Sequence, residues 1–120
     1  FTITGPGSPS VKSNMLTSIE QHVEFVTDTL LYLREHRVST IEPELKAEDD
    51  WVNHVQEVAN QTLFPKANSW YMGANIPGKP RLFMPYIGGV GAYRQKCEAF
   101  AAAGYEGFRL ERDSKVAAAE

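Results

Sequence analysis

The chain has 120 residues and a formal charge of −3, with 42% hydrophobic and 22% charged residues, which is typical of one globular domain. Its acidic balance excludes a general attraction to nucleic acid or to an anionic membrane, so neither is expected as a partner. No apolar run reaches the roughly 18 residues that a membrane-spanning helix needs. The single cysteine excludes an internal disulfide and predicts a reducing, cytoplasmic location.

The chain opens on residues 1–4, which alternate bulky and β-branched side chains and predict a short strand. There is no initiator methionine, and a strand needs neighbours that satisfy its backbone. We therefore expect the chain to be a piece of a larger protein. Residues 5–10 hold two glycines, two prolines and two serines, which predicts a loop.

Residues 13–34 give the clearest helical pattern. Apolar side chains recur at steps of three and four and form one stripe: Met15, Ile19, Val23, Val26, Leu30 and Leu33. Either Ser13 or Asn14 is expected to be the N-cap. Leu16 and Leu31 widen the face that we expect to be buried.

Two further helices are predicted. Residues 38–42 form an extended connector that Pro43 ends, and a helix over 46–61 follows, with acidic side chains in its first turn. An alanine-rich helix is expected over 92–103, with Gly104 as the residue that terminates it.

Between these helices, residues 66–91 lose the helical period and are rich in glycine, proline and aromatic side chains. Short strands are expected over 82–87, at a sheet edge because of Pro85, and over 105–110. Residues 114–120 are expected to form a frayed tail. The predicted fold class is α+β and mainly helical, with three helices, few short strands and one long loop.

Metal and hydrolase chemistry find no support in the residue pattern. His22, His36 and His54 lack the close helical spacing of a metal site. Cys97 has no evident His or Lys neighbour that would lower its pKa, so we expect it to act as a small buried hydrophobe. No serine lies in a nucleophile elbow.

The loop over residues 5–10 has a superficial likeness to a dinucleotide-binding fingerprint. Pro6 and Pro9 remove two amides that would bind pyrophosphate, and Ser10 stands where the third glycine would be, so we reject a phosphate cradle. The helix that begins near Asn14 and Met15 still offers unpaired amides and a positive dipole end. Such an end suits a negatively polarised group such as the carbonyl edge of a flavin; the alternative is an ordinary capped helix.

The loop over residues 68–81 is a second candidate site. Long glycine- and proline-punctuated loops are uncommon unless they are functional. Trp70 and Tyr71 offer aromatic faces there, and Lys79 and Arg81 suit a phosphate. The alternative is an irregular loop whose Trp70 fills a core.

These two regions carry a resemblance to the Baeyer–Villiger monooxygenases, a family of flavoproteins. The resemblance covers nearly the whole chain and rests on ITGPGSPS at 3–10, SNMLTSIEQHVEFVTD at 13–28, EDDWVNHVQEVANQTLFP at 48–65, NSWYMGANIPGKPRLFMPYIGG at 68–89 and YRQKCEAFAAAGYEGF at 93–108. It implies an enzyme with two dinucleotide-binding domains of α/β type that hold FAD and NADPH. It also implies insertion of one oxygen atom of O2 beside the carbonyl of a small-molecule ketone, which gives an ester or lactone.

The resemblance also implies site residues. Asn14 and Met15 would lie against the flavin, and Trp70 would contact NADP from a mobile loop that helps to close the site. The substrate pocket would be lined by Ser10, Val11, Lys12 and Phe83. A closing loop makes physical sense because reactive oxygen chemistry must be shielded from water.

Departures from the family pattern limit what this chain would do alone. It has no G-x-G-x-x-G motif, no family-identifying stretch and no arginine matching the one that supports oxygen activation, so we expect no catalytic residue here and no activity without the rest of the enzyme. Lys12 replaces a residue that is usually apolar.

The expected organisation has five segments: the end of an FAD-binding domain at 1–37, a helical connector at 38–66, the mobile NADP and substrate loop at 67–91, a closing helix and segment at 92–113, and a tail at 114–120. The missing N-terminal part of the same enzyme is the expected partner. Two alternatives stay open: a flavin monooxygenase that oxygenates nitrogen or sulfur, and a free-standing helical interaction module.

Overall fold

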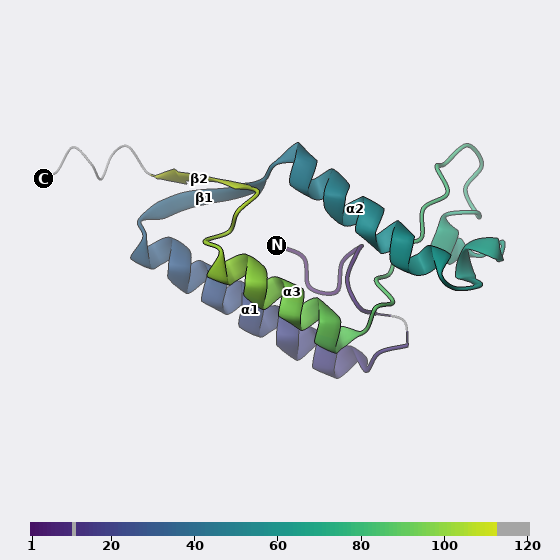
Figure 1. Cartoon of the computed structure of the whole chain (residues 1–120), viewed down its shortest axis with the longest axis horizontal. Coiled ribbons are helices and arrows are strands. Elements are labelled where there is room, and N and C mark those ends of the chain that lie inside the picture. The colour runs from purple at the N-terminus through teal and green to yellow at the C-terminus, as the bar shows by residue number, and fades with distance from the viewer. Residues whose placement is uncertain (11, 113–120) are drawn as a thin grey trace, which may run out of the picture.

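A computed structural model describes residues 1–10 and 12–112 of the chain (Figure 1). Its elements are, in order, α1 (Met15–Glu35), β1 (Val38–Pro43), α2 (Leu45–Asn60), the 3-10 turns η1 (Phe64–Lys66) and η2 (Trp70–Met72), α3 (Val90–Ala102) and β2 (Phe108–Arg112). The three predicted helices are therefore confirmed, and so is the mainly helical α+β fold class. The predicted tail over 114–120 and Val11 lie outside the described residues.

The helices form an open frame (Figure 1). α1 and α3 lie side by side, and α2 runs along the other side of the N-terminal segment. β1 follows α1 and β2 follows α3, and the two strands pair antiparallel from Pro43–Phe108 to Val38–Arg112. Because the strands close one end of the frame, the loop over residues 68–81 is left at the opposite end.

The helix ends follow the sequence signals. Asn14 is the N-cap of α1, and its side-chain oxygen accepts a hydrogen bond from the Leu16 amide at 3.0 Å. After α3, Gly104 adopts a left-handed φ of 71°, the conformation that commonly ends a helix. Both caps were expected because they depend only on neighbouring residues.

Two predicted strands are wrong. Residues 1–4 form a turn in which Thr4 has a φ of 53°, and its amide donates to His22 Nδ1 rather than to a strand. Residues 82–87 are extended but make single backbone bonds to different partners, for example from the Met84 amide to the Tyr71 carbonyl. The strand expected over 105–110 begins only at Phe108, because the turn before it has residues at positive φ.

Much of the apolar stripe of α1 is exposed rather than buried. Met15, Val23 and Leu30 are 42%, 45% and 52% exposed, and of the predicted stripe only Leu33 is buried. The face that packs inside the chain is instead polar: Ser18, Gln21, His22 and Thr29. The expected burial of Leu16 and Leu31 is therefore wrong, because α1 meets α3 and the N-terminal segment through this polar face.

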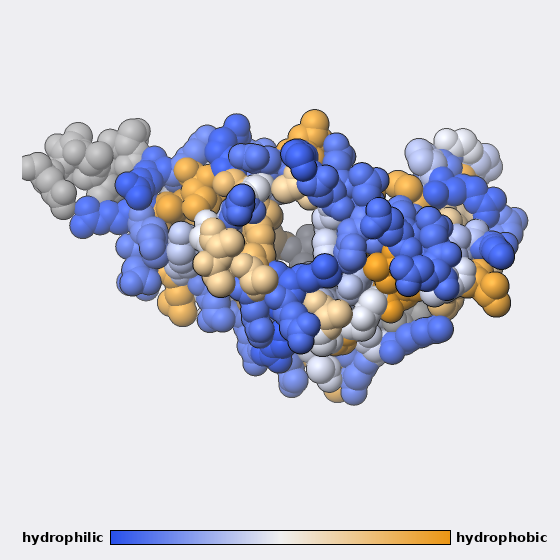
Figure 2. Space-filling view, viewed as in Figure 1, coloured by the Kyte–Doolittle hydropathy of each residue, from blue (hydrophilic) through white to orange (hydrophobic). Residues whose placement is uncertain are grey.

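The buried apolar core is small and lies near α2. Ala59, Met72 and Phe83 form its centre, and partly buried side chains pack around them: Phe64, Tyr71, Ala74 and Ile87. The radius of gyration is 16.9 Å, whereas a compact domain of this length has about 14 Å. Figure 2 shows apolar residues reaching the surface and an opening near the centre of the view. The frame is thus more open than a self-contained domain.

Candidate functional site

The loop over residues 5–10 is held on three sides. The Gly7 amide donates to the Met84 carbonyl at 2.7 Å, and the Trp51 indole donates to the Gly7 carbonyl at 3.2 Å. The Ser8 carbonyl accepts from the Tyr86 amide at 3.0 Å. Gly7 has a φ of 76°, which favours glycine. The loop that leads into α1 is therefore fixed by α2 and by the segment after the long loop.

The N-terminus of α1 is open to its surroundings. Asn14 and Met15 are exposed, and the described first turn of the helix carries no acidic side chain. The positive end of the helix dipole is therefore not neutralised within this turn. Such a helix end favours a negatively polarised group, and the carbonyl edge of a flavin, which the sequence predicts for Asn14 and Met15, is one.

The predicted substrate segment lies next to this helix end. Ser10 is half-buried, and Val11 lies outside the described residues. Lys12 is exposed at a φ of 62°, with its Nζ atom 4.8 Å from the centre of the Phe64 ring. A cavity of about 420 Å³ is lined by Lys12, Thr62, Leu63, Phe64 and Ala67. The segment thus presents a cation beside an apolar cavity.

The two predicted aromatic site residues differ in exposure. Trp70 is 63% exposed in η2, and its ring centre lies 4.0 Å from that of Tyr71, so the alternative in which Trp70 fills a core does not apply to the described arrangement. Phe83 is 1% exposed and packs in the core. The Tyr71 carbonyl accepts from the Met84 amide, which joins η2 to the Phe83 segment.

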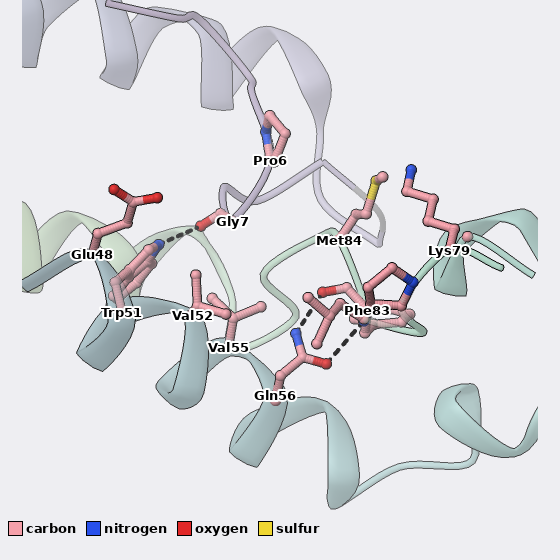
Figure 3. Close-up of a pocket in the computed structure, with 13 residues that line it drawn as sticks. Pro6, Gly7, Glu48, Trp51, Val52, Val55, Gln56, Lys79, Phe83 and Met84 are labelled. Atoms are coloured by element: carbon pink, nitrogen blue, oxygen red, sulfur yellow. Dashed lines mark hydrogen bonds between the residues drawn. The ribbon is translucent and has the colours of Figure 1, made fainter. Parts of the chain in front are cut away.

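Two residues that the sequence did not single out for this site come from α2. Gln56 holds the backbone of Phe83 from both sides: its Nε2 donates to the Phe83 carbonyl at 2.8 Å, and its Oε1 accepts from the Phe83 amide at 2.9 Å (Figure 3). Trp51 reaches Gly7 from the same helix. Both border a second cavity of about 420 Å³ between α2, Pro6 and Lys79 (Figure 3).

A polar layer lies between α1 and α3. His22 Nδ1 accepts from the Thr4 amide at 3.0 Å, so the neutral ring carries its proton on Nε2, which is buried and has no partner among the described residues. The His22 ring meets Tyr93 edge to face at 5.4 Å. Burial lowers the pKa of His22 and raises the pKa of the Tyr93 and Cys97 side chains. These groups are therefore held neutral.

The lowered pKa of His22 predicts a loss of stability in acid. The unfolded state, with a histidine pKa of about 6.5, binds the proton more tightly than the folded state. The free energy of unfolding should therefore fall as the pH drops below about 6.5, because the charged ring also loses the Thr4 bond. Urea unfolding across this range should show the decline, and His22→Gln should flatten it. The matched change His36→Gln, at an exposed histidine, should leave the decline in stability in place. If His22→Gln also leaves the decline unchanged, His22 is not its cause.

The described residues contain no group of three or more His, Cys, Asp or Glu side chains placed to hold a metal ion. Within the same residues, no helix is both long and apolar enough to cross a membrane. Cys97 is half-buried rather than fully buried.

More than nine tenths of the chain is similar to known monooxygenases. No protein-family model matches it. It is 44% identical over 92% of its length to acetone monooxygenase (methyl acetate-forming) of Gordonia sp. (strain TY-5), and 38% identical over 94% to phenazine N-monooxygenase PhzNO1 of Lysobacter antibioticus. It superposes on cyclohexanone monooxygenase from Rhodococcus sp. Phi1 bound to NADP+ with a TM-score of 0.84, at 38% identity over 92% of the chain.

The chain spans only about a fifth of these relatives: 21%, 20% and 20% of their lengths, respectively. Complexes with NADP and with FAD occur among the similar solved structures. The match extends through the capped helix, the α2 region and the long loop, which are the segments that build the candidate site. The chain therefore matches a segment of the Baeyer–Villiger monooxygenases, the flavoprotein family that its sequence resembles.

Proposed function

We propose that this chain is part of an FAD- and NADPH-dependent Baeyer–Villiger monooxygenase, hereafter the complete enzyme, which inserts one oxygen atom of O2 beside a ketone carbonyl to give an ester or lactone. The observation that carries this proposal is the family match over more than nine tenths of the chain. The lack of a G-x-G-x-x-G motif supports the further inference that the chain is inactive alone.

Within that enzyme, the surroundings of Asn14, Met15 and Trp70 support the roles predicted for them. Asn14 and Met15 would hold the flavin at the open end of α1, because the amides and dipole there favour a negatively polarised carbonyl edge. Bound FAD, reduced by NADPH, supplies the oxygen-activating chemistry. Trp70 is exposed and so is available to cover NADP from its loop. Closure of that loop would exclude water from the reacting centre.

The substrate pocket would lie between the loop that precedes α1 and the segment after the long loop. Ser10, Val11 and Lys12 would form one wall, and Phe83 would support the other from the core. The Lys12 ammonium lies over the Phe64 ring, so that charge lies beside an otherwise apolar cavity. This pocket would orient a ketone rather than donate or remove a proton.

The five-segment organisation over 1–37, 38–66, 67–91, 92–113 and 114–120 belongs to the same proposal. The exposed apolar stripe of α1 supports it, because such a stripe is stabilised when the missing part of the enzyme covers it. That missing part is the proposed partner of this chain.

A substrate panel on the complete enzyme tests the reaction. With NADPH and O2 we expect esters or lactones from cyclic and open-chain ketones. The competing function is oxygenation of nitrogen, which the similarity to a phenazine N-monooxygenase favours. Amines, phenazines and sulfides therefore belong in the same panel. Oxides from these compounds, with no ester from any ketone, would reject the proposed reaction and support the competing one.

A further inference from the structure

We propose that Trp51 and Gln56 are positioning residues of the oxygenation reaction: from α2 they fix the loop that leads into the flavin-facing end of α1 relative to the segment that carries Phe83. This inference rests on the proposed function. Neither side chain is expected to touch the flavin or the ketone. Their effect would pass through the backbone: Trp51 holds Gly7 directly, and Gln56 holds Phe83 directly.

The Gln56 side chain makes hydrogen bonds to both backbone polar groups of Phe83. One side-chain amide donates to the Phe83 carbonyl and accepts from the Phe83 amide, at 2.8 and 2.9 Å. Because Phe83 is not part of a strand, no ladder of backbone bonds holds it otherwise. Two bonds from one rigid amide plane therefore set the position and the orientation of the two peptide groups that flank the Phe83 Cα atom. The Phe83 ring, 1% exposed, follows its backbone into the core.

Trp51 fixes the loop over residues 5–10 from the same helix. Its indole N–H donates to the Gly7 carbonyl at 3.2 Å, and the indole ring lies so close that a Cβ atom on Gly7 would approach Trp51 Nε1 to 2.8 Å. The Trp51 ring is itself packed against Tyr86 and Tyr93, with centroids 5.3 and 5.8 Å away. The loop thus rests on a side chain that has little freedom to move.

The two held segments are also joined directly. The Gly7 amide donates to the Met84 carbonyl, and the Tyr86 amide donates to the Ser8 carbonyl. Together with the bonds from Trp51 to Gly7 and from Gln56 to Phe83, which Figure 3 shows, they join the loop, the Phe83 segment and α2 in one closed set of hydrogen bonds. Moving either side chain would shift the two proposed pocket walls relative to each other. A displacement of about 1 Å far from the chemistry is enough to slow catalysis about 100-fold.

The test compares Gln56→Met and Trp51→Phe with Gln61→Met in the complete enzyme. Met preserves the length of Gln56 but neither hydrogen bond, Phe keeps an aromatic ring without the N–H, and Gln61 is an exposed residue at the end of the same helix. Three quantities are measured: hydrogen exchange at the Phe83 amide, kcat/KM for ester formation, and hydrogen peroxide released per NADPH consumed.

We expect exchange at the Phe83 amide to be about tenfold faster in Gln56→Met, as loss of one hydrogen bond implies. In both α2 variants kcat/KM should fall about tenfold or more and peroxide should rise, while Gln61→Met stays within about twofold of wild type. If Gln56→Met fails to fold, Trp51→Phe decides. Variants whose folded fraction keeps wild-type kcat/KM and peroxide yield would overturn the positioning role alone. A wild-type enzyme that makes no ester would overturn the proposed function and this role together.

Discussion

Replacing Gly7 by alanine is expected to lower the free energy of unfolding by about 2–4 kcal/mol. A left-handed φ of 76° costs an alanine about 1 kcal/mol. The new Cβ would lie 2.8 Å from Trp51 Nε1, and the Trp51 ring cannot move aside easily because it packs against Tyr86. Such overpacking costs about 1–3 kcal/mol more. Urea unfolding of the protein measures the total. In the complete enzyme the same change should reduce FAD retention, because the loop leads into the flavin-facing end of α1.

Gly78→Ala separates these two causes. Gly78 has a φ of 77°, almost the same as Gly7, but an added Cβ would meet nothing within 4 Å. This variant should therefore lose only the backbone cost of about 1 kcal/mol. Equal losses at the two glycines would show that Trp51 does not constrain the loop, and would contradict the account of how the loop is held.

Replacing Val23 by aspartate is expected to destabilise the complete enzyme much more than the chain alone. In this chain Val23 is 45% exposed, so the new carboxylate remains hydrated and costs less than about 1 kcal/mol. If the missing part of the enzyme covers the α1 stripe, the same carboxylate is buried without a partner. We then expect a loss of about 3 kcal/mol or more, with poor yield of soluble enzyme.

Leu31→Asp is the matched control. Leu31 is 58% exposed, and helical spacing places it on the flank of α1 that carries Glu24 and Asp28. If the missing part covers the stripe and leaves this charged flank in solvent, Leu31→Asp should cost a few tenths of a kcal/mol in both forms of the protein. Thermal unfolding and soluble yield compare the variants. A complete enzyme that tolerates Val23→Asp as well as Leu31→Asp would favour the alternative of a free-standing interaction module.

Helices were predictable here because their signals are local. The apolar period, Asn14 as a cap and Gly104 as a terminator all lie within a few residues of the elements that they define. Strands were not, because their stability comes from partners elsewhere. Residues 1–4 have strand-like composition and no partner strand, whereas Val38 pairs with Arg112 near the other end of the described chain.

The apolar face of α1 was expected to be buried, but much of it is exposed, because its packing also depends on partners elsewhere. Under the proposed function the missing part of the enzyme would cover the apolar stripe, whereas this chain leaves Met15, Val23 and Leu30 exposed. Instead Thr29 packs inward, where its hydroxyl accepts a hydrogen bond from the Tyr105 hydroxyl at 3.1 Å. No periodicity in the sequence indicates such a polar contact.

Some residues of the candidate site could be predicted from the sequence, and others could not. Asn14, Met15 and Trp70 were predicted through family resemblance, and the structure leaves them exposed, as their proposed roles require. Trp51 and Gln56 were not predicted, because their backbone partners lie 44 and 27 residues away in the sequence. In the sequence, Trp51 belongs to the apolar side of a helix and Gln56 is an ordinary polar position.

The central claim is that this chain supplies the flavin-facing helix and the NADP loop of a Baeyer–Villiger monooxygenase. Co-expression of the chain with the remainder of the enzyme tests it most directly, with flavin absorbance and NADPH-dependent ester formation as the measurements. We predict a yellow complex that makes ester from a ketone, and neither property from either part alone. Full flavin binding and ester formation by the remainder without this chain, or no recovery when both are present, would contradict the claim.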